Sequence, residues 1–340
     1  MADTNYLDKI LQPEDVKKLS LEELDSLATE IREEIIEVVS KNGGHLGSNL
    51  GVVDLTLALY KIFDIRRDNI IWDGSYQTYA HKLLTGRRER FHTLRKFGGI
   101  CGFGWKPESE FDPFNFGHVG TGLATAYGCT VANQKLKTDR RTVCIIGDGS
   151  MTSGVAYEAL NNIGHTKLPM TVILNDNGFS ISKTVGALAS YFQQLRTAPF
   201  YDEAKKEIHK FLQNFPGGKS VESMLEGMRR GLKQSLFPNM FTALGFQYYG
   251  PIDGHDIAKL IKVFENVRNQ DKPVLLHVVT QKGKGHPDAD SDPYGLHKHT
   301  GPTLPVEAKL EPEGKERPIA SKSYTRAFVD ALTDLSEEDP

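Results

Sequence analysis

One segment in the middle of this 340-residue sequence limits the possible folds more than any other. An apolar, β-branched run from Thr142 to Ile146 enters Gly147-Asp148-Gly149, and a helical pattern follows up to Gly164. A second apolar run, Met170 to Leu174, enters Asn175-Asp176-Asn177. Strand, glycine turn, helix and strand form a βαβ unit, and continuous apolar runs are typical of parallel strands covered on both faces. We therefore predict an α/β domain with an open, mostly parallel sheet flanked by helices.

The N-terminal part carries two helical patterns separated by a glycine pair. Ser20 and Glu23 form a capping box, and apolar residues then recur at helical spacing until Gly43-Gly44. Because a glycine pair lets the backbone turn sharply, we expect an irregular segment from His45 to Ser48. A second helix is predicted from Val52 to Phe63.

The C-terminal half continues the alternation of helix and strand and then changes in character. A helix is predicted from Ile257 to Arg268, and a buried strand from Val274 to Val279. Residues 186–240 show helical patterns without strand signals and contain Pro216-Gly217-Gly218, which indicates a helical insertion. Residues 301–320 are rich in proline and charge, as linkers are.

A short amphipathic helix is predicted after the linker, from Ser323 to Leu335. Its apolar stripe consists of Tyr324, Phe328, Leu332 and Leu335. Such a stripe needs a cover, so the helix either docks on the preceding domain or begins a further one. We therefore expect a domain at residues 1–300, a linker at 301–320, and the start of a second domain at 321–340.

Composition indicates a soluble protein that acts on small molecules. The 41 basic and 44 acidic residues are interspersed, which gives no support for nucleic acid or an anionic membrane as the partner. Three cysteines without CxxC spacing favour a reducing compartment, and we expect the cytoplasm. No apolar stretch approaches the roughly 18 residues that a membrane-spanning helix needs.

Two polar strand ends give the strongest chemical signal. Asp148 follows the first apolar strand and Asn177 follows the second, so their side chains converge if these strands are neighbours. Carboxylate and amide oxygens suit a divalent cation such as Mg²⁺, completed by phosphate oxygens, water and a carbonyl just after Asn177. Gly147 and Gly149 let the backbone approach a phosphate at the start of a helix. The alternative is a tight turn with an ordinary capping asparagine.

Further motifs make nearly the whole chain resemble one family. They are Asn42-Gly43-Gly44-His45-Leu46-Gly47, Trp72-Asp73, His81-Lys82-Leu83-Leu84-Thr85-Gly86-Arg87-Arg88, Gly117-His118, Leu174-Asn175-Asp176-Asn177, Gly250-Pro251-Ile252-Asp253-Gly254-His255-Asp256 and Lys282-Gly283-Lys284-Gly285. Together with Gly147-Asp148-Gly149, they resemble the 1-deoxy-D-xylulose-5-phosphate synthases, which are of the transketolase type. The resemblance implies a transferase of isoprenoid biosynthesis with thiamine diphosphate and Mg²⁺ as cofactors. It also implies a sugar phosphate or a 2-oxo acid as substrate.

The resemblance also implies roles for single residues. Asp148, Asn177 and the carbonyl of Phe179 would ligate Mg²⁺. The residues near the cofactor would be Tyr76, Gly117, His118, Val119, Gly149, Ser150, Asn177 and His286. His45 would transfer protons on the substrate, because imidazole titrates near neutrality. His297 would line the same substrate pocket.

Three of these positions differ from the family pattern. Tyr76 stands where a histidine is expected near the diphosphate, Val119 replaces a serine, and His286 replaces a tyrosine. A phenol can form a hydrogen bond with a phosphate, but it cannot offer a cationic imidazole. These differences bear on the substrate more than on the fold.

The family also has a pyrimidine-binding domain, whose glutamate activates the cofactor. The residues after Tyr324 resemble only the start of that domain. We therefore expect one subunit of a split enzyme that binds a separate pyrimidine-binding subunit and forms an oligomer. Two alternatives stay open: a non-catalytic cofactor-binding or regulatory homologue, and a truncated fragment of a 1-deoxy-D-xylulose-5-phosphate synthase.

Overall fold

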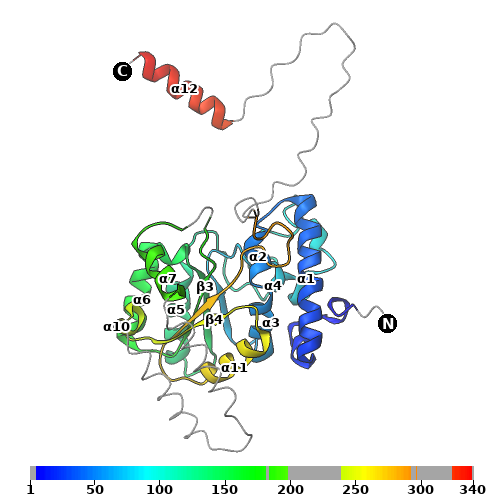
Figure 1. Ribbon diagram of the computed structural model, residues 1–340, viewed down its shortest axis with the longest axis vertical. Coiled ribbons are helices and arrows are strands. Elements are labelled where there is room, and N and C mark those ends of the chain that lie inside the picture. The colour runs from blue at the N-terminus through cyan, green and yellow to red at the C-terminus, as the bar shows by residue number, and fades with distance from the viewer. Residues whose placement is uncertain (1–4, 181–183, 198–238, 292–295, 297–323, 339–340) are drawn as a thin grey trace, which may run out of the picture. The chain divides into compact units, whose positions relative to one another are not determined.

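The computed structural model describes residues 5–180, 184–197, 239–291, 296 and 324–338 (Figure 1). The chain divides into two units, Met1–Gly301 and Pro302–Pro340, which are described separately. Within the described ranges, no helix is both long and apolar enough to cross a membrane. The predicted linker and most of the predicted insertion, residues 198–238, lie outside these ranges.

The strands in the described part of the first unit form one parallel sheet of five, in the order β1-β2-β3-β5-β4. Their bounds are β1 Asn69–Trp72, β2 Thr142–Gly147, β3 Thr171–Asp176, β4 Gln247–Asp253 and β5 Val274–Val279. The parallel α/β class is therefore confirmed, as are the three strands predicted from apolar runs. β1 and β4 were not predicted, because β1 has four residues and β4 contains Gly250 and Pro251.

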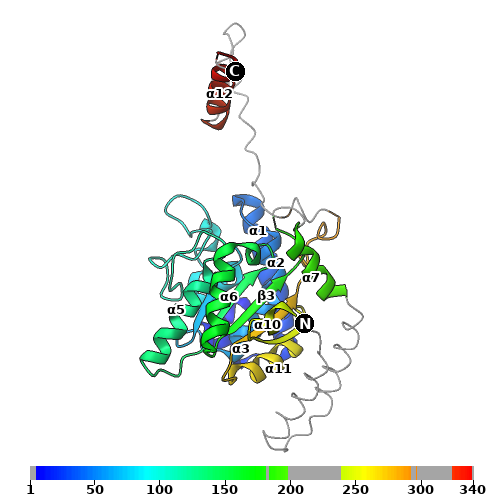
Figure 2. The same ribbon diagram turned by 90° about the vertical axis from the view of Figure 1, so that its left-hand side faces the viewer.

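Helices cover both faces of the sheet (Figures 1 and 2). One face packs against α1 (Leu21–Asn42), α3 (Val53–Ile62) and α11 (Ile257–Arg268), and the other against α5 (Gly122–Lys135), α6 (Gly154–Thr166), α7 (Ala187–Thr197) and α10 (Met240–Ala243). Successive β2 residues alternate between the two cores: Val143 and Ile145 face the first, Cys144 and Ile146 the second. Fully burying one such side chain contributes about 1.5–3 kcal/mol, which explains why the strands are apolar throughout.

The helix predicted from the capping box begins and ends as expected. The Ser20 side chain accepts from the Glu23 N–H, the Glu23 carboxylate accepts from the Ser20 N–H, and α1 ends at Asn42 before Gly43. The expectation of an irregular segment up to Ser48 was wrong, because α2 (Gly47–Gly51) begins inside it. Leu46 and Leu50 are fully buried, and the Leu50 N–H donates to the Leu46 carbonyl at 3.1 Å, so burial closes a helical turn there.

Several short helical elements also lie in the described part of the first unit. They are η1 (Leu7–Lys9), η2 (Pro13–Lys18), α4 (Tyr79–Lys82), η3 (Leu83–Arg87), η4 (Phe91–Thr93) and η5 (Ser150–Thr152). In the second unit, α12 (Tyr324–Glu338) confirms the predicted helix, although Ser323 lies outside the described residues. Phe328, Val329, Leu332 and Leu335 of α12 are exposed.

Candidate functional site

The carboxyl ends of β2 and β3 lie side by side. Gly147 pairs with Asn175, and the Asp148 N–H donates to the Asn175 carbonyl at 3.2 Å. The Asp148 carboxylate accepts a hydrogen bond from the Asn177 N–H and another from the Thr184 hydroxyl, the latter at 3.0 Å. The predicted adjacency of the two strand ends is therefore confirmed, and the Asp148 carboxylate contacts the backbone of Asn177 there.

The segment after Asn177 forms a tight turn over this end of the sheet. The Asn177 Oδ1 accepts from the Phe179 N–H at 3.0 Å. A buried lysine, Lys282, reaches the same turn: its Nζ donates to the Ser180 carbonyl at 3.0 Å and lies 5.5 Å from the centre of the Phe179 ring. A methyl group added to Gly149 would come within 2.9 Å of the Ser180 Cβ, so this turn and the β2–α6 connection are in close contact.

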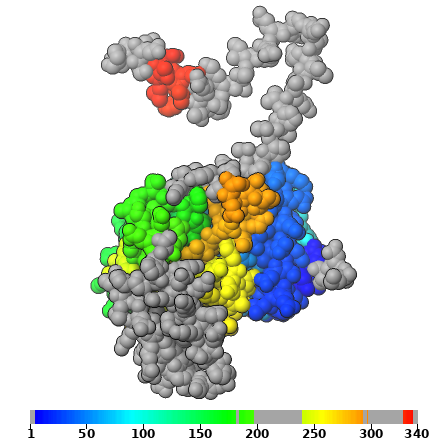
Figure 3. All heavy atoms as spheres, in the orientation of Figure 1, coloured from blue at the N-terminus to red at the C-terminus, as the bar shows by residue number. Residues whose placement is uncertain are grey.

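Lys282 and Thr184 also lie at this site, and neither was predicted to belong to it. Lys282 is only 3% exposed, and it follows the carboxyl end of β5, which pairs with β3. This segment, orange in Figure 3, lies at the surface beside the N-terminal helices in blue. Lys282 could have been predicted from its position in the sequence. A lysine in a glycine-rich turn just after a parallel strand lies where ligands bind in such sheets.

The electrostatics at the Asp148 carboxyl favour a cation. Burial, and next the charge of Asp176, raise the pKa of Asp148 to about 7. Asp176 itself is paired, with Arg196 Nη1 at 2.9 Å and His277 Nε2 at 2.8 Å. Among the described residues, no group of three or more His, Cys, Asp or Glu side chains could hold a metal. A cation at Asp148 would therefore take most of its ligands from carbonyls, water or a bound phosphate, which suits Mg²⁺.

A pH dependence of folding follows for the metal-free chain. The pKa of Asp148 is raised in the folded state from 3.8 to about 7, so the folded chain binds a proton that the unfolded chain has released between these values. We expect the free energy of unfolding to fall as the pH rises from about 4 to about 7, and this fall to be smaller in Asp148→Asn. Urea unfolding at several pH values, without Mg²⁺, checks this. Identical pH profiles of the two proteins would contradict it.

Tyr76 lies over the glycine turn at the end of β2. A methyl group added to Gly147 would collide with the Tyr76 hydroxyl, and Ser150 forms side-chain hydrogen bonds with both Tyr76 and Asp73. Burial raises the pKa of Tyr76 well above its usual range, so the side chain is a neutral phenol at neutral pH. Tyr76 and Ser150 thus meet at the turn that was predicted to approach a phosphate.

Asp73, at the end of β1, holds the loop that precedes α5. Its two carboxylate oxygens accept from the Gly120 N–H at 2.8 Å and the Gly122 N–H at 2.7 Å. In this loop His118 is exposed, and a methyl group added to Gly117 would meet no heavy atom within 4 Å. Val119 is 53% exposed.

Val119 and Tyr76 come together at one glycine. A methyl group on Gly74 would lie 3.2 Å from the Val119 side chain and 3.1 Å from the Tyr76 ring. Two of the three positions that differ from the family pattern are therefore neighbours in space. The third, His286, makes a local contact instead: its Nδ1 accepts from the Asp288 N–H at 3.1 Å.

Of the two histidines predicted to be catalytic, His45 lies within the described residues. The His45 ring lies 6.1 Å from the Tyr76 ring, which places it beside the glycine turn. The His45 carbonyl accepts from the Asn49 side chain at 2.6 Å, which fixes the backbone there. His297 lies outside the described residues, although the preceding Leu296 accepts from the Gly47 N–H at 2.6 Å.

Comparison with solved structures defines the class of fold. The transketolase from Campylobacter jejuni superimposes with a TM-score of 0.60 at 21% identity, covering 82% of this chain and 41% of that one. The chain therefore has a transketolase-type α/β fold.

Comparison with known sequences identifies the family. A family model of 1-deoxy-D-xylulose-5-phosphate synthase matches residues 7–280. The enzymes of that name from Methylacidiphilum infernorum and Thermomicrobium roseum are 45% and 49% identical over 97% and 86% of this chain. The chain belongs to the 1-deoxy-D-xylulose-5-phosphate synthase family. It spans about half the length of these relatives, 51% and 47%.

Proposed function

We propose that this chain binds thiamine diphosphate with Mg²⁺ and forms the diphosphate-binding half of an enzyme like 1-deoxy-D-xylulose-5-phosphate synthase. One observation carries the proposal. The buried Asp148 carboxyl, the Asn177 turn and the buried ammonium of Lys282 gather at the carboxyl ends of neighbouring parallel strands. This combination suits a cation that bridges the protein to an anionic ligand, and strand carboxyl ends are where such sheets bind ligands.

Each residue of the turn has a role in this proposal. The Asp148 carboxylate, the Asn177 amide oxygen and the Phe179 carbonyl hold Mg²⁺. The backbone of Gly149 and the hydroxyl of Ser150 contact the diphosphate, and Tyr76 offers it a neutral hydroxyl. Burial lowers the pKa of Lys282, and the charge of Asp148 opposes this shift. The Lys282 side chain reaches the turn after Asn177, where it would contribute positive charge to the site.

The remaining predicted residues surround the reacting end of the cofactor. Gly117, His118 and Val119 would lie near the thiazolium side of the cofactor, while His286 and His297 would line the pocket. When bound, the cofactor supplies an electron sink for forming and breaking carbon–carbon bonds. His45 moves protons on the substrate, a sugar phosphate or a 2-oxo acid, because imidazole exchanges protons near neutral pH.

The partner in this proposal is a pyrimidine-binding domain on another chain. The matched relatives are about twice as long as this chain, and α12 exposes an apolar face of Phe328, Val329, Leu332 and Leu335. We propose residues 1–300 as the diphosphate domain, 301–320 as a linker, and 321–340 as the docking element for the partner. A bound partner would supply the glutamate that activates the cofactor.

A non-catalytic binding protein is the second candidate, because the Tyr76 phenol fills the space over Gly147.

Titration calorimetry of the purified chain tests whether the site binds the cofactor at all. Thiamine diphosphate is expected to bind in the presence of Mg²⁺ and to lose affinity when EDTA is added. Thiamine, which lacks the diphosphate, is the matched control ligand. Equal affinity for both ligands, without any effect of Mg²⁺, would refute the site.

A further inference from the structure

The imidazole of His45 contacts aromatic rings from two separate segments. Tyr76, just after β1, lies 6.1 Å away between ring centres, and the Phe103 ring lies 5.7 Å away at an angle of 66° to the imidazole plane. Phe103 belongs to residues 101–116, which we call the 101–116 loop. This loop joins η4 to the segment before α5 without a helix or strand of its own. Side chains from neighbouring segments contact this loop and fix its position.

The backbone on both sides of Phe103 is held by such contacts. The Cys101 N–H donates to Glu108 Oε2 at 2.7 Å, and the Trp105 N–H donates to Asp112 Oδ2 at 3.0 Å. Between them, the Gly104 N–H donates to the Ser75 hydroxyl at 2.9 Å. Two carboxylates and one hydroxyl thus fix the chain within two residues of the Phe103 ring.

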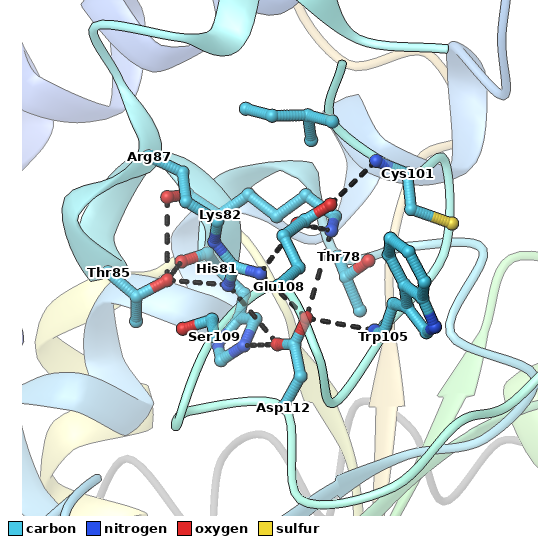
Figure 4. A network of polar contacts seen from close by, with 12 residues as sticks. Thr78, His81, Lys82, Thr85, Arg87, Cys101, Trp105, Glu108, Ser109 and Asp112 are labelled. Carbon is cyan, nitrogen blue, oxygen red and sulfur yellow. Dashed lines mark hydrogen bonds and ion pairs between the residues drawn. The ribbon is translucent and has the colours of Figure 1, made fainter. Parts of the chain in front are cut away.

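These two carboxylates belong to a buried ion network, which consists of His81, Lys82, Arg87, Glu108 and Asp112 (Figure 4). Lys82 contacts Glu108 at 2.5 Å, Arg87 contacts Glu108 at 2.9 Å and Asp112 at 2.6 Å, and His81 contacts Asp112 at 2.7 Å. No side chain of the network is more than 6% exposed. Each of these contacts joins α4 or η3 to the 101–116 loop, so the network fixes this loop.

The charges of the network balance. Burial lowers the pKa of His81, so its ring is neutral at neutral pH, and two cations face two carboxylates. Burial alone would raise the pKa of Asp112, but the contacts with His81 and Arg87 hold it below its usual value. A buried ion that loses its partner is strongly unfavourable, so the loop cannot move away from α4 and η3 without breaking several contacts at once.

We propose that Phe103 is a positioning residue for His45 and that the buried ion network keeps Phe103 in place. This inference rests on the proposed role of His45 in proton transfer. Phe103 packs against the imidazole and carries no group that could exchange a proton, so it acts only through the orientation of His45. A proton carrier needs a fixed orientation, since a displacement of about 1 Å can cost about 100-fold in rate.

Nuclear magnetic resonance of the histidine ring protons in the full chain tests the contact directly. His45→Gln assigns the His45 signals. Phe103→Leu is expected to shift them, because the aromatic ring current is lost. Ser75→Ala, which removes the acceptor of the Gly104 N–H and leaves the ion network intact, is expected to shift the same signals. The matched control is Phe111→Leu in the same loop, whose ring instead contacts Arg66 at 4.8 Å. Unshifted His45 signals in Phe103→Leu would overturn the inference.

Turnover with a pyrimidine-binding chain present tests the consequence. Phe103→Leu is expected to lower kcat by about 10- to 100-fold with little change in KM, as for a misplaced catalytic group. Phe111→Leu should leave both values unchanged. If His45→Gln abolishes turnover but Phe103→Leu does not reduce it, the positioning role is overturned and the proposed function stands. If His45→Gln retains full turnover, the proposed role of His45 fails and this inference fails with it.

Discussion

Asp148→Asn is expected to lower the Mg²⁺-dependent affinity of the chain for thiamine diphosphate by about 100-fold or more. The substitution keeps the size of the side chain and its contact with Thr184, but it removes the negative charge that would meet the cation. Losing one partner of a buried charge contact costs about 2–5 kcal/mol, and about 1.4 kcal/mol corresponds to a factor of ten. Titration calorimetry with Mg²⁺ at a fixed excess measures the change.

The matched control for this experiment is Asp256→Asn. Asp256 caps α11, with its carboxylate accepting from the Lys259 N–H at 2.9 Å, and asparagine caps helices equally well. The control should therefore bind like the unmodified chain. Unfolding measurements on Asp148→Asn show separately whether the fold is intact. Affinity of Asp148→Asn equal to that of the unmodified chain would remove Asp148 from the metal site.

The second prediction with a large expected effect concerns the catalytic turnover of this chain. These 340 residues alone are expected to turn over neither pyruvate nor a ketose donor. Turnover should appear when the unmatched half of the Methylacidiphilum infernorum relative is added as a separate chain. The reason is that cofactor activation is proposed to need a glutamate of the pyrimidine-binding domain. Product formation measured with each chain alone and with both together checks this, and turnover by the 340-residue chain alone would contradict it.

The same pair of chains tests the docking role of α12. Phe328, Leu332 and Leu335 are 64%, 50% and 61% exposed, and burying each fully would contribute about 1.5–3 kcal/mol. A variant that ends at Gly314 should keep its fold and bind the partner more weakly by calorimetric titration. Phe97→Ser is a control, because Phe97 is an exposed apolar residue outside α12. Equal partner affinity in the shortened chain would show that α12 has no such role.

The central sheet was predictable because its strands are buried on both faces. Val143 to Ile146 alternate between two cores, so every position is apolar and the strand is visible in the sequence. β4 was missed for the opposite reason, since its partly exposed positions and Pro251 mask the pattern. The short helix at Gly47–Gly51 depends on burial of Leu46 and Leu50, which only the tertiary structure reveals.

The candidate site was predictable only where it depends on neighbouring strands. Asp148 and Asn177 follow consecutive apolar runs, so their meeting follows from parallel pairing. The contact of Lys282 with the Ser180 carbonyl joins residues 102 positions apart, and no local pattern encodes it. The buried ion network was not predicted either: His81, Lys82 and Arg87 belong to a family motif, but no local pattern encodes their contacts with Glu108 and Asp112.

The order of the strands also affects how copies of this chain can associate. β1 and β4 form the two edges of the sheet, and an edge strand can recruit a strand from another molecule. β1 offers only four residues, while β4 lacks the N–H donor of Pro251 and shifts its register between Tyr249 and Ile252. Neither edge presents the long, regular row of donors and acceptors that continuous pairing between molecules requires. Among the described strands, the sheet edges are therefore poor templates for pairing between copies of this chain.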